Sequence, residues 1–280
     1  MVCYQEEVRD PSRIPEVLNR VIERAWRGSA PAQINVPRDF WTQIIDVELP
    51  QIVRLERSPG GAQAISDAAK LLSEAAFPVI LSGAGVVIGG AIPECQALAE
   101  KLSAPVCSGY QHNDSFPGSH PMAAGPLGYN GSKAGMELIA KADVVLALGT
   151  RLNPFSTLPG YGIDYWPKDA KIIQVDINPD RIGLTKKVTV GICGDAKQVA
   201  TQILAQMGPE AGERNRAERE ATIHQTKSAW LQALSSMDHE DDDPGTVWNE
   251  EARVRDADLM SPRKAWRAIQ AGLPKDAIIS

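Results

Sequence analysis

Polar residues directly follow three apolar runs that have the pattern of buried β-strands. Gly149-Thr-Arg151-Leu-Asn153 follows the run 144–148, Asp176-Ile177 ends the run that starts at Lys171, and Gly194-Asp195 opens a helical pattern. In an open parallel sheet, ligands bind at the carboxyl ends of the strands. A planar arginine suits a phosphate, a carboxylate suits ribose hydroxyls, and a helix N-terminus favours an anion. The pattern therefore predicts a nucleotide-binding edge made by Arg151, Asn153, Asp176, Ile177 and Asp195.

The turn Gly83-Ala-Gly85 after another apolar run has the shape of a phosphate-binding turn, so both glycines are candidate cofactor-binding residues. The third glycine, Gly89, comes one position late for GxGxxG, and no acidic residue follows the next strand to hold a ribose. The sequence therefore disfavours a dinucleotide-dependent oxidoreductase, and tight strand-to-helix packing is the alternative role of the turn. For Asp195 the alternative is a helix N-cap, with Gln198 as its capping-box partner.

A polar loop rich in glycine and proline follows the next predicted strand and carries two of the four histidines. Loops on a rigid scaffold often carry function, so this loop is a possible active-site contributor. A surface loop closed by its own hydrogen bonds is the alternative. The candidates are His112, Asn113, Asp114 and His120.

The cysteines and the acidic run give no sign of a metal site. The four cysteines have no CxxC or other ligand spacing, which suits a reducing compartment, and we interpret all of them as small apolar fillers. The acidic run 238–243 lacks the alternated spacing and glycine bend of a calcium loop, so we expect a solvated turn. No residue of the chain is assigned a catalytic or metal-binding role.

Between residues 62 and 208, apolar runs alternate with helical patterns. Apolar strands that alternate with helices indicate a parallel sheet covered on both faces, with right-handed crossovers. We therefore predict a doubly wound, mostly parallel, six-stranded α/β domain of the Rossmann-like kind. The runs that read as strands are 78–82, 104–107, 144–148, 171–176 and 187–190.

The flanking segments are too short to form cores of their own. Residues 1–40 contain one amphipathic helix and one short strand, which predicts the end of an α/β domain. Residues 41–61 are a predicted linker, and 209–258 a charged helical linker solvated along its length. Residues 259–280, with a helix capped at Ser261-Pro262 and a strand from Asp276, begin another domain. The sequence is therefore expected to be truncated at both ends.

Composition excludes several classes of partner. Lys+Arg 29 against Asp+Glu 35 gives a net charge of -6, so no basic field attracts nucleic acid or anionic lipid. An anionic substrate needs a local cationic site. No apolar run approaches the ~18 residues of a membrane span, and the N-terminus lacks the apolar core of a signal peptide. We expect a cytoplasmic protein without nucleic-acid or membrane partners.

The order of these motifs resembles that of the thiamine-diphosphate-dependent enzymes. Pro31-Ala-Gln-Ile-Asn-Val-Pro-Arg-Asp39 resembles the end of their pyrimidine-binding domain, and Ser261-Pro-Arg to Ser280 resembles the entry to their pyrophosphate-binding domain. The segments that resemble their central domain are 78–85, 142–151, 173–178 and 194–196. Within the family, segments 111–118, 125–133 and 155–167 most resemble the sulfoacetaldehyde acetyltransferases.

The resemblance implies a transferase that converts sulfoacetaldehyde and phosphate to acetyl phosphate and sulfite, with thiamine diphosphate and Mg²⁺ bound outside this chain. The activating glutamate would precede Met1 and the Gly-Asp-Gly metal motif would follow Ser280, so we expect the 280-residue piece to be inactive. The resemblance also implies a second subunit, as a homodimer or homotetramer. Relatives carry FAD or ADP on the central domain, which maps to Arg151, Asp176, Ile177 and Asp195; a vestigial site is the alternative, because the Arg-Phe pair after Gly149 is missing.

Two other functions stay open at this stage. One is a related thiamine-diphosphate enzyme that acts on 2-keto acids, as acetolactate synthase does. The other is a non-catalytic nucleotide-binding module, because a fold does not fix a function.

Overall fold

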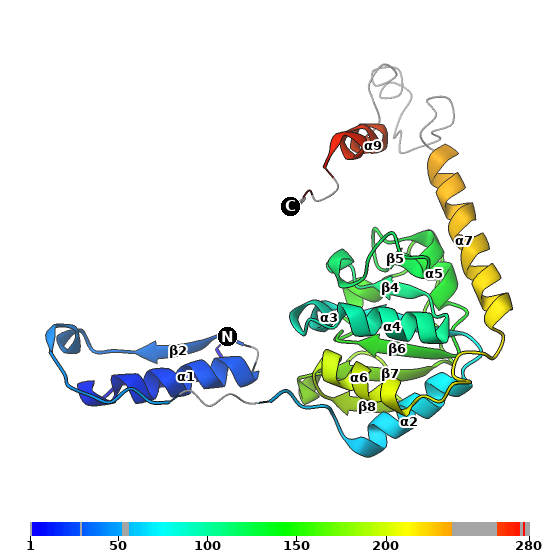
Figure 1. Cartoon of the computed structure of the whole chain (residues 1–280). Coiled ribbons are helices and arrows are strands. Elements are labelled where there is room, and N and C mark those ends of the chain that lie inside the picture. The colour runs from blue at the N-terminus through cyan, green and yellow to red at the C-terminus, as the bar shows by residue number, and fades with distance from the viewer. Residues whose placement is uncertain (1, 29, 52–55, 237–261, 275–276, 278–280) are drawn as a thin grey trace.

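The computed structural model describes residues 2–28, 30–51, 56–236, 262–274 and 277. Figure 1 shows a small N-terminal unit, a central domain built on one sheet, and helix α7 leading away from that domain towards α9. Among the described helices, none is long and apolar enough to cross a membrane.

The central sheet has six parallel strands in the order β5-β4-β3-β6-β7-β8. This is the dinucleotide-fold order, with the direction of winding reversed between β3 and β6, and it confirms the predicted doubly wound six-stranded sheet. The reversal brings the loop after β3 next to the loop after β6. The strands are β3 (Pro78–Ser82), β4 (Val106–Ser108), β5 (Ala123–Pro126), β6 (Val144–Leu148), β7 (Lys171–Asp176) and β8 (Val190–Cys193).

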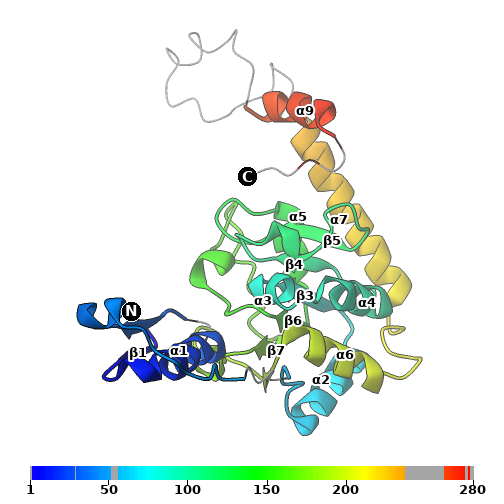
Figure 2. The same ribbon diagram turned by 60° about the vertical axis from the view of Figure 1, so that its left-hand side comes forward.

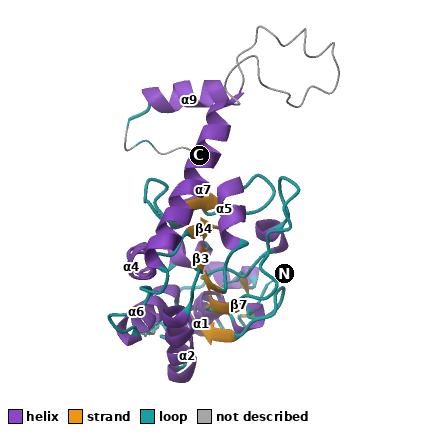
Figure 3. Ribbon diagram, turned by 90° about the vertical axis from the view of Figure 1, so that its right-hand side faces the viewer, coloured by secondary structure: helices purple, strands orange, loops and turns teal. Residues whose placement is uncertain are grey.

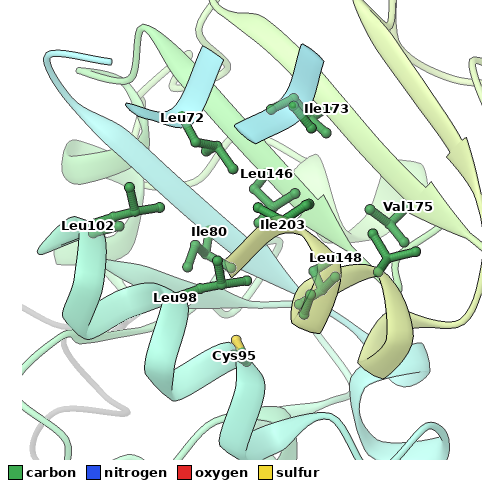
Figure 4. Packing of buried hydrophobic residues seen from close by; sticks show 14 of the residues in the cluster. Leu72, Ile80, Cys95, Leu98, Leu102, Leu146, Leu148, Ile173, Val175 and Ile203 are labelled. Carbon is green, nitrogen blue, oxygen red and sulfur yellow. The ribbon is translucent and has the colours of Figure 1, made fainter. Parts of the chain in front are cut away.

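Alternate residues along the strands fill two apolar cores, one on each face of the sheet. Ile80 of β3 faces the core formed with α2 (Ala62–Glu74), α4 (Ile92–Leu102) and α6 (Ala196–Gln206), seen in Figure 4. Val79 faces the opposite core, formed with α5 (Lys133–Ile139). Figure 3 shows the sheet from the side with helices on either side of it. A rigid strand edge between two cores is the scaffold on which the site loops are mounted.

Three strands of the central sheet differ from the predictions. The strand predicted at 104–107, β4, lies at Val106–Ser108. The prediction assigned no strand to β5, because Ala-Ala-Gly-Pro has no β-branched or aromatic residue. The last strand, predicted at 187–190, lies at Val190–Cys193. It is an edge strand that alternates exposed and buried positions only partly, so periodicity marks its ends poorly.

The N-terminal unit has two parallel strands rather than the single one predicted. β1 (Tyr4–Glu7) pairs with β2 (Ala32–Asn35), and α1 (Ile14–Gly28) packs on them through Val17 and Val21. The polar sequence of β1 hides it from pattern analysis, and its pairing is supported by a double hydrogen bond from Arg20 of α1 to Glu6. The predicted linker 41–61 begins within the short 3-10 helix η2 (Arg38–Thr42) and has no other helix or strand among its described residues.

Helix α7 (Arg216–Ser236) corrects the prediction of a charged linker that is solvated from residue 209 onward. Ile223 joins the core beside α5, and Arg219 is only 1% exposed. The Arg219 guanidinium donates to five carbonyl oxygens, those of Ala76, Leu102, Ser103, Gly212 and Arg214. The first half of α7 therefore belongs to the central domain.

Helix α9 (Pro262–Gly272) agrees with the helix predicted to end at Gly272. Three other predictions lie outside the described residues: the acidic turn 238–243, the cap at Ser261 and the strand from Asp276.

Candidate functional site

A groove of about 930 Å³ runs along the carboxyl edge of the central sheet. The loops that follow β3, β4, β5, β6, β7 and β8 line it, and so does Trp26 of α1. The groove therefore sits at the switch point of the sheet, where ligands of this fold bind. It gathers the predicted edge residues Gly83, Gly85, Arg151, Asn153, Asp176, Ile177 and Asp195 in one place.

The Gly83–Gly85 turn holds the loops after β3 and β6 against each other. Gly83 precedes the five-residue helix α3 (Ala84–Ile88), and the Gly85 N–H donates to the Gly149 carbonyl at 2.8 Å. A Cβ on Gly85 would lie 2.7 Å from the Gly149 Cα, which no side chain tolerates. The geometry favours the alternative raised from the sequence: these glycines allow backbone to approach backbone, although both still line the groove.

One end of the groove is cationic. Arg57, Arg151 and Arg181 line it, and Arg57 pairs with Asp195 at 2.9 Å. Among the described residues, Arg151 and Arg181 form no ion pair within 4.0 Å, so both guanidinium groups are available to an anion. Sequence reasoning missed Arg181, although it lies in the turn after β7 at the same edge. It also missed Arg57, for which the linker sequence contains no signal.

The two predicted carboxylates have different surroundings. Asp176 is 6% exposed, and its Oδ1 accepts the Asn178 N–H at 2.9 Å. Asp195 uses Oδ1 to cap α6 at the N–H groups of Lys197 and Gln198, while Oδ2 accepts from Arg57. Asp176 thus keeps one oxygen without a hydrogen bond from the described residues, whereas both oxygens of Asp195 have protein partners.

The capping box expected between Asp195 and Gln198 is not formed. In such a box the glutamine side chain would accept the Asp195 backbone N–H. That N–H donates instead to the Ser58 carbonyl at 2.9 Å, which ties the linker to the start of α6. Asp195 is therefore the N-cap of α6, which is the alternative role predicted from the sequence, but Gln198 does not complete a capping box with it.

Gln174 is a buried polar residue within β7 that sequence reasoning passed over. Its Nε2 donates to the carbonyls of Thr150 and Arg181, at 3.3 and 3.1 Å, and its Oε1 accepts the Gly183 N–H at 2.9 Å. One side chain thus fixes the loops that carry Arg151 and Arg181. A glutamine between the apolar residues Ile173 and Val175 was the available signal, because a buried amide needs partners.

The predicted histidine loop is divided by the structure. His112 lines the groove, while His120 lies outside it with Nε2 3.2 Å from Glu100 and its ring edge-on to Phe116. Asn113 accepts from Ser108 at 3.3 Å, and Asp114 is exposed. Of these four candidates only His112 lines the groove, and Asn113, Asp114 and His120 lie outside it.

The second end of the groove is aromatic. Tyr110 and His112 come from the loop after β4, Tyr129 from the loop after β5, and Phe155 from the loop after β6. Asn153, a predicted ligand residue, accepts the Phe155 N–H at 3.0 Å and so caps the short helix η4 (Pro154–Thr157). The groove therefore suits an extended molecule with an anionic group at one end and an apolar or planar group at the other.

The cysteines fall into two classes, which corrects their interpretation as four fillers. Cys95 and Cys107 are buried, and burial raises the pKa of each thiol to about 12. Cys3 and Cys193 are exposed. Across the part of the chain that the structure describes, no three His, Cys, Asp or Glu side chains come together as a metal site.

Comparison with known proteins places this geometry in a family. Residues 65–203 match the sequence profile "Thiamine pyrophosphate enzyme, central domain". All 280 residues align at 80% identity with a Rhizobium meliloti protein named "Probable sulfoacetaldehyde acetyltransferase". The chain belongs to the thiamine pyrophosphate enzyme family. It covers 47% of that relative, so it spans about half the length of the curated proteins it matches.

Other known proteins show graded similarity to the chain. "Sulfoacetaldehyde acetyltransferase" of Roseovarius nubinhibens is 75% identical over the whole chain, which covers 46% of it. "Acetolactate synthase large subunit" of Corynebacterium glutamicum is 29% identical over 97% of the chain and is covered to 41%. The crystal structure of benzoylformate decarboxylase from Polynucleobacter necessarius shares the fold, with a TM-score of 0.64 at 21% identity over 77% of this chain and 40% of that one.

Proposed function

We propose that this chain is the middle of a thiamine-diphosphate-dependent sulfoacetaldehyde acetyltransferase, which converts sulfoacetaldehyde and phosphate to acetyl phosphate and sulfite. The observation that carries the proposal is 80% and 75% identity over all 280 residues with two proteins of that name. The predicted resemblance of segments 111–118, 125–133 and 155–167 to these enzymes agrees with it.

Thiamine diphosphate supplies the nucleophilic carbon of such reactions when it is bound, while protein groups orient and neutralise the substrate. The described residues contain no carboxylate cluster that fits Mg²⁺, so we assign the cofactor and metal to segments outside them and derive no step through either. Within this chain, the cationic end of the groove, with Arg151 and Arg181, fits a phosphate-bearing or other anionic ligand.

The test uses the natural protein that contains this chain, with thiamine diphosphate, Mg²⁺, phosphate and sulfoacetaldehyde supplied. We expect sulfite and acetyl phosphate to appear in equal amounts, and sulfite release to stop when phosphate is left out. The second candidate is an acetolactate synthase-like enzyme, favoured by the 29% identity over 97% of the chain. Acetolactate formed from pyruvate, without sulfite release from sulfoacetaldehyde, would select it.

For the groove itself we propose a nucleotide-binding role, with ADP or FAD as the ligand. Arg151 and Arg181 would face the phosphates, the free oxygen of Asp176 would accept from a ribose hydroxyl, and Ile177 would pack on the base. Asn153 and Asp195 would shape the two ends through their caps.

Titration calorimetry with ADP on the 280-residue chain tests this role. Arg151→Ala should weaken ADP about tenfold or more, the loss of one charge-assisted phosphate contact of ~1.5–3 kcal/mol, whereas Arg27→Ala on α1 should leave the affinity unchanged. Equal affinity of the Arg151 variant and the parent chain would refute the nucleotide edge. Lack of ADP binding by the parent, with FAD also unbound, would indicate that the groove is vestigial.

We also propose that the whole enzyme is a homodimer or homotetramer in the cytoplasm that takes a small anionic substrate and phosphate. The two exposed thiols, Cys3 and Cys193, and the two buried free ones are compatible with a reducing compartment. Light scattering of the natural protein measures its subunit number, and a monomer would contradict the proposal.

A further inference from the structure

Helix α7 lies beside the central domain and holds three of the loops that line the groove, those that follow β4, β5 and β6. Figures 1 and 2 show it rising from the α2 and α6 side of the domain past α5. The hydrogen bonds of Arg219 hold the start of α7 on the domain. Two side chains one helical turn apart, Lys227 and Trp230, contact the groove loops further along the helix.

Lys227 fastens the loop that follows β4. Its Nζ donates to the carbonyls of Pro121 and His120 at 2.6 and 3.4 Å, and partial burial lowers the pKa of the ammonium group. The same loop begins with Tyr110, Gln111 and His112 in the groove. Its middle is held from inside the domain by Ser115, whose Oγ lies 2.6 Å from Ser82 Oγ and 2.7 Å from the His112 carbonyl.

Trp230 fastens the loops that follow β5 and β6. Its ring meets the Tyr161 ring edge-on with centroids 5.5 Å apart, and the Tyr161 hydroxyl donates to the Gly131 carbonyl at 3.1 Å. Tyr161 has φ +53°, a conformation that costs a non-glycine residue and persists where its surroundings hold it. These loops carry Phe155 and Tyr129 into the aromatic end of the groove.

We propose that Lys227 and Trp230 are positioning residues that set the conformation of the aromatic end of the groove, so that groove and helix α7 are mechanically coupled. Lys227 controls the loop of Tyr110 and His112, and Trp230 controls the loops of Tyr129 and Phe155. The proposal concerns loop geometry and goes beyond the nucleotide role. By linkage, any ligand that orders these loops also stabilises the docked α7.

Hydrogen–deuterium exchange of the 280-residue chain without ligand tests the proposal. Lys227→Met should raise the exchange rate of residues 109–122 about tenfold, and Trp230→Ala should do so for 128–131 and 153–162, each leaving the other set near the parent rate. Lys227→Arg and Trp230→Phe, which keep a donor and a ring, should restore most of the protection. Lys70→Met on α2 and Leu231→Ala, a 61% exposed neighbour, are the matched controls.

Unchanged exchange of both loop sets in the Met and Ala variants would overturn the proposal. A uniform rise over the whole domain would also overturn it, because it would show a general loss of stability rather than positioning. Neither outcome depends on ADP, so failure of the nucleotide role and failure of this coupling are separate results. If ADP binds, its addition should slow exchange in α7 of the parent chain, and no change there would contradict the linkage.

Discussion

Replacing Arg219 by methionine should detach α7 from the central domain. Arg219 Nε, Nη1 and Nη2 donate to five carbonyls, at distances from 2.5 to 3.0 Å. Three of these carbonyls lie at the ends of α2 and α4, where helix dipoles favour a cation. The guanidinium of Arg219 therefore connects the C-terminal ends of α2 and α4 to the start of α7.

The expected cost follows from these contacts. Hydrogen bonds to a charged group contribute ~1.5–3 kcal/mol each, but the desolvation of the buried guanidinium offsets much of that sum, and removal of one partner from a buried charged network costs about 3–5 kcal/mol. Since a domain of this size loses ~2–4 °C of Tm per kcal/mol, Arg219→Met should lower Tm by roughly 6–20 °C. Arg219→Lys should fall between, because a lysine has three donors and no planar fork.

Thermal unfolding followed by circular dichroism, together with hydrogen exchange of α7, measures the effect. Arg27→Met is the control, because its i,i+4 pair with Glu23 is exposed. A shift for Arg219→Met no larger than that of the control would refute the reasoning that this residue anchors the helix. So would a Tm loss in which exchange rises in the central sheet before it rises in α7.

Three further outcomes follow from the geometry. Gly85→Ala should destabilise the chain by about 1–3 kcal/mol, because its Cβ meets backbone of the loop after β6; chemical denaturation measures this, and wild-type stability would contradict it. Hydrogen bonds from Arg20 and then Tyr4 lower the pKa of Glu6 from 4.5 to about 2. The stability that ionised Glu6 gives to the N-terminal unit is therefore complete above pH 4.5 and is lost as the pH falls towards 2. NMR titration of the Arg20→Met variant should find this pKa raised, and an unchanged value would contradict the prediction. A thiol reagent at pH 8 should modify the exposed Cys3 and Cys193 in the folded chain, and all four cysteines after unfolding. Cys95 and Cys107 should be protected by burial, which raises the pKa of both thiols. Four fast reactions in the folded chain would contradict this prediction.

The central sheet could be predicted because its strands are nearly continuous apolar runs with helices between them. β3 and β6 lie where the sequence places them, and so do α2 and α4. β1 and β5 could not be found in this way, because their stability comes from pairing with a neighbour strand rather than from their own residue types.

The position of the candidate site could be predicted from the sequence, but the roles of its residues could be predicted only in part. Strand ends of a parallel sheet meet at one edge, so Arg151 and Asp176 were expected together and lie together. The role of Asp195 depends on Arg57 and Ser58, which are over 130 residues away in the chain and reach it only through the fold. Arg219 was hidden for the same reason: its charge suggested solvent, and the five carbonyls that bind it come from three separate segments.

The most direct test of the proposed function is one product analysis on the natural protein that contains this chain, supplied with thiamine diphosphate, Mg²⁺, phosphate and sulfoacetaldehyde. We predict sulfite and acetyl phosphate in a one-to-one ratio, with no sulfite when phosphate is omitted. Loss of sulfoacetaldehyde without acetyl phosphate, or acetolactate formation from pyruvate by a protein that leaves sulfoacetaldehyde intact, would contradict it.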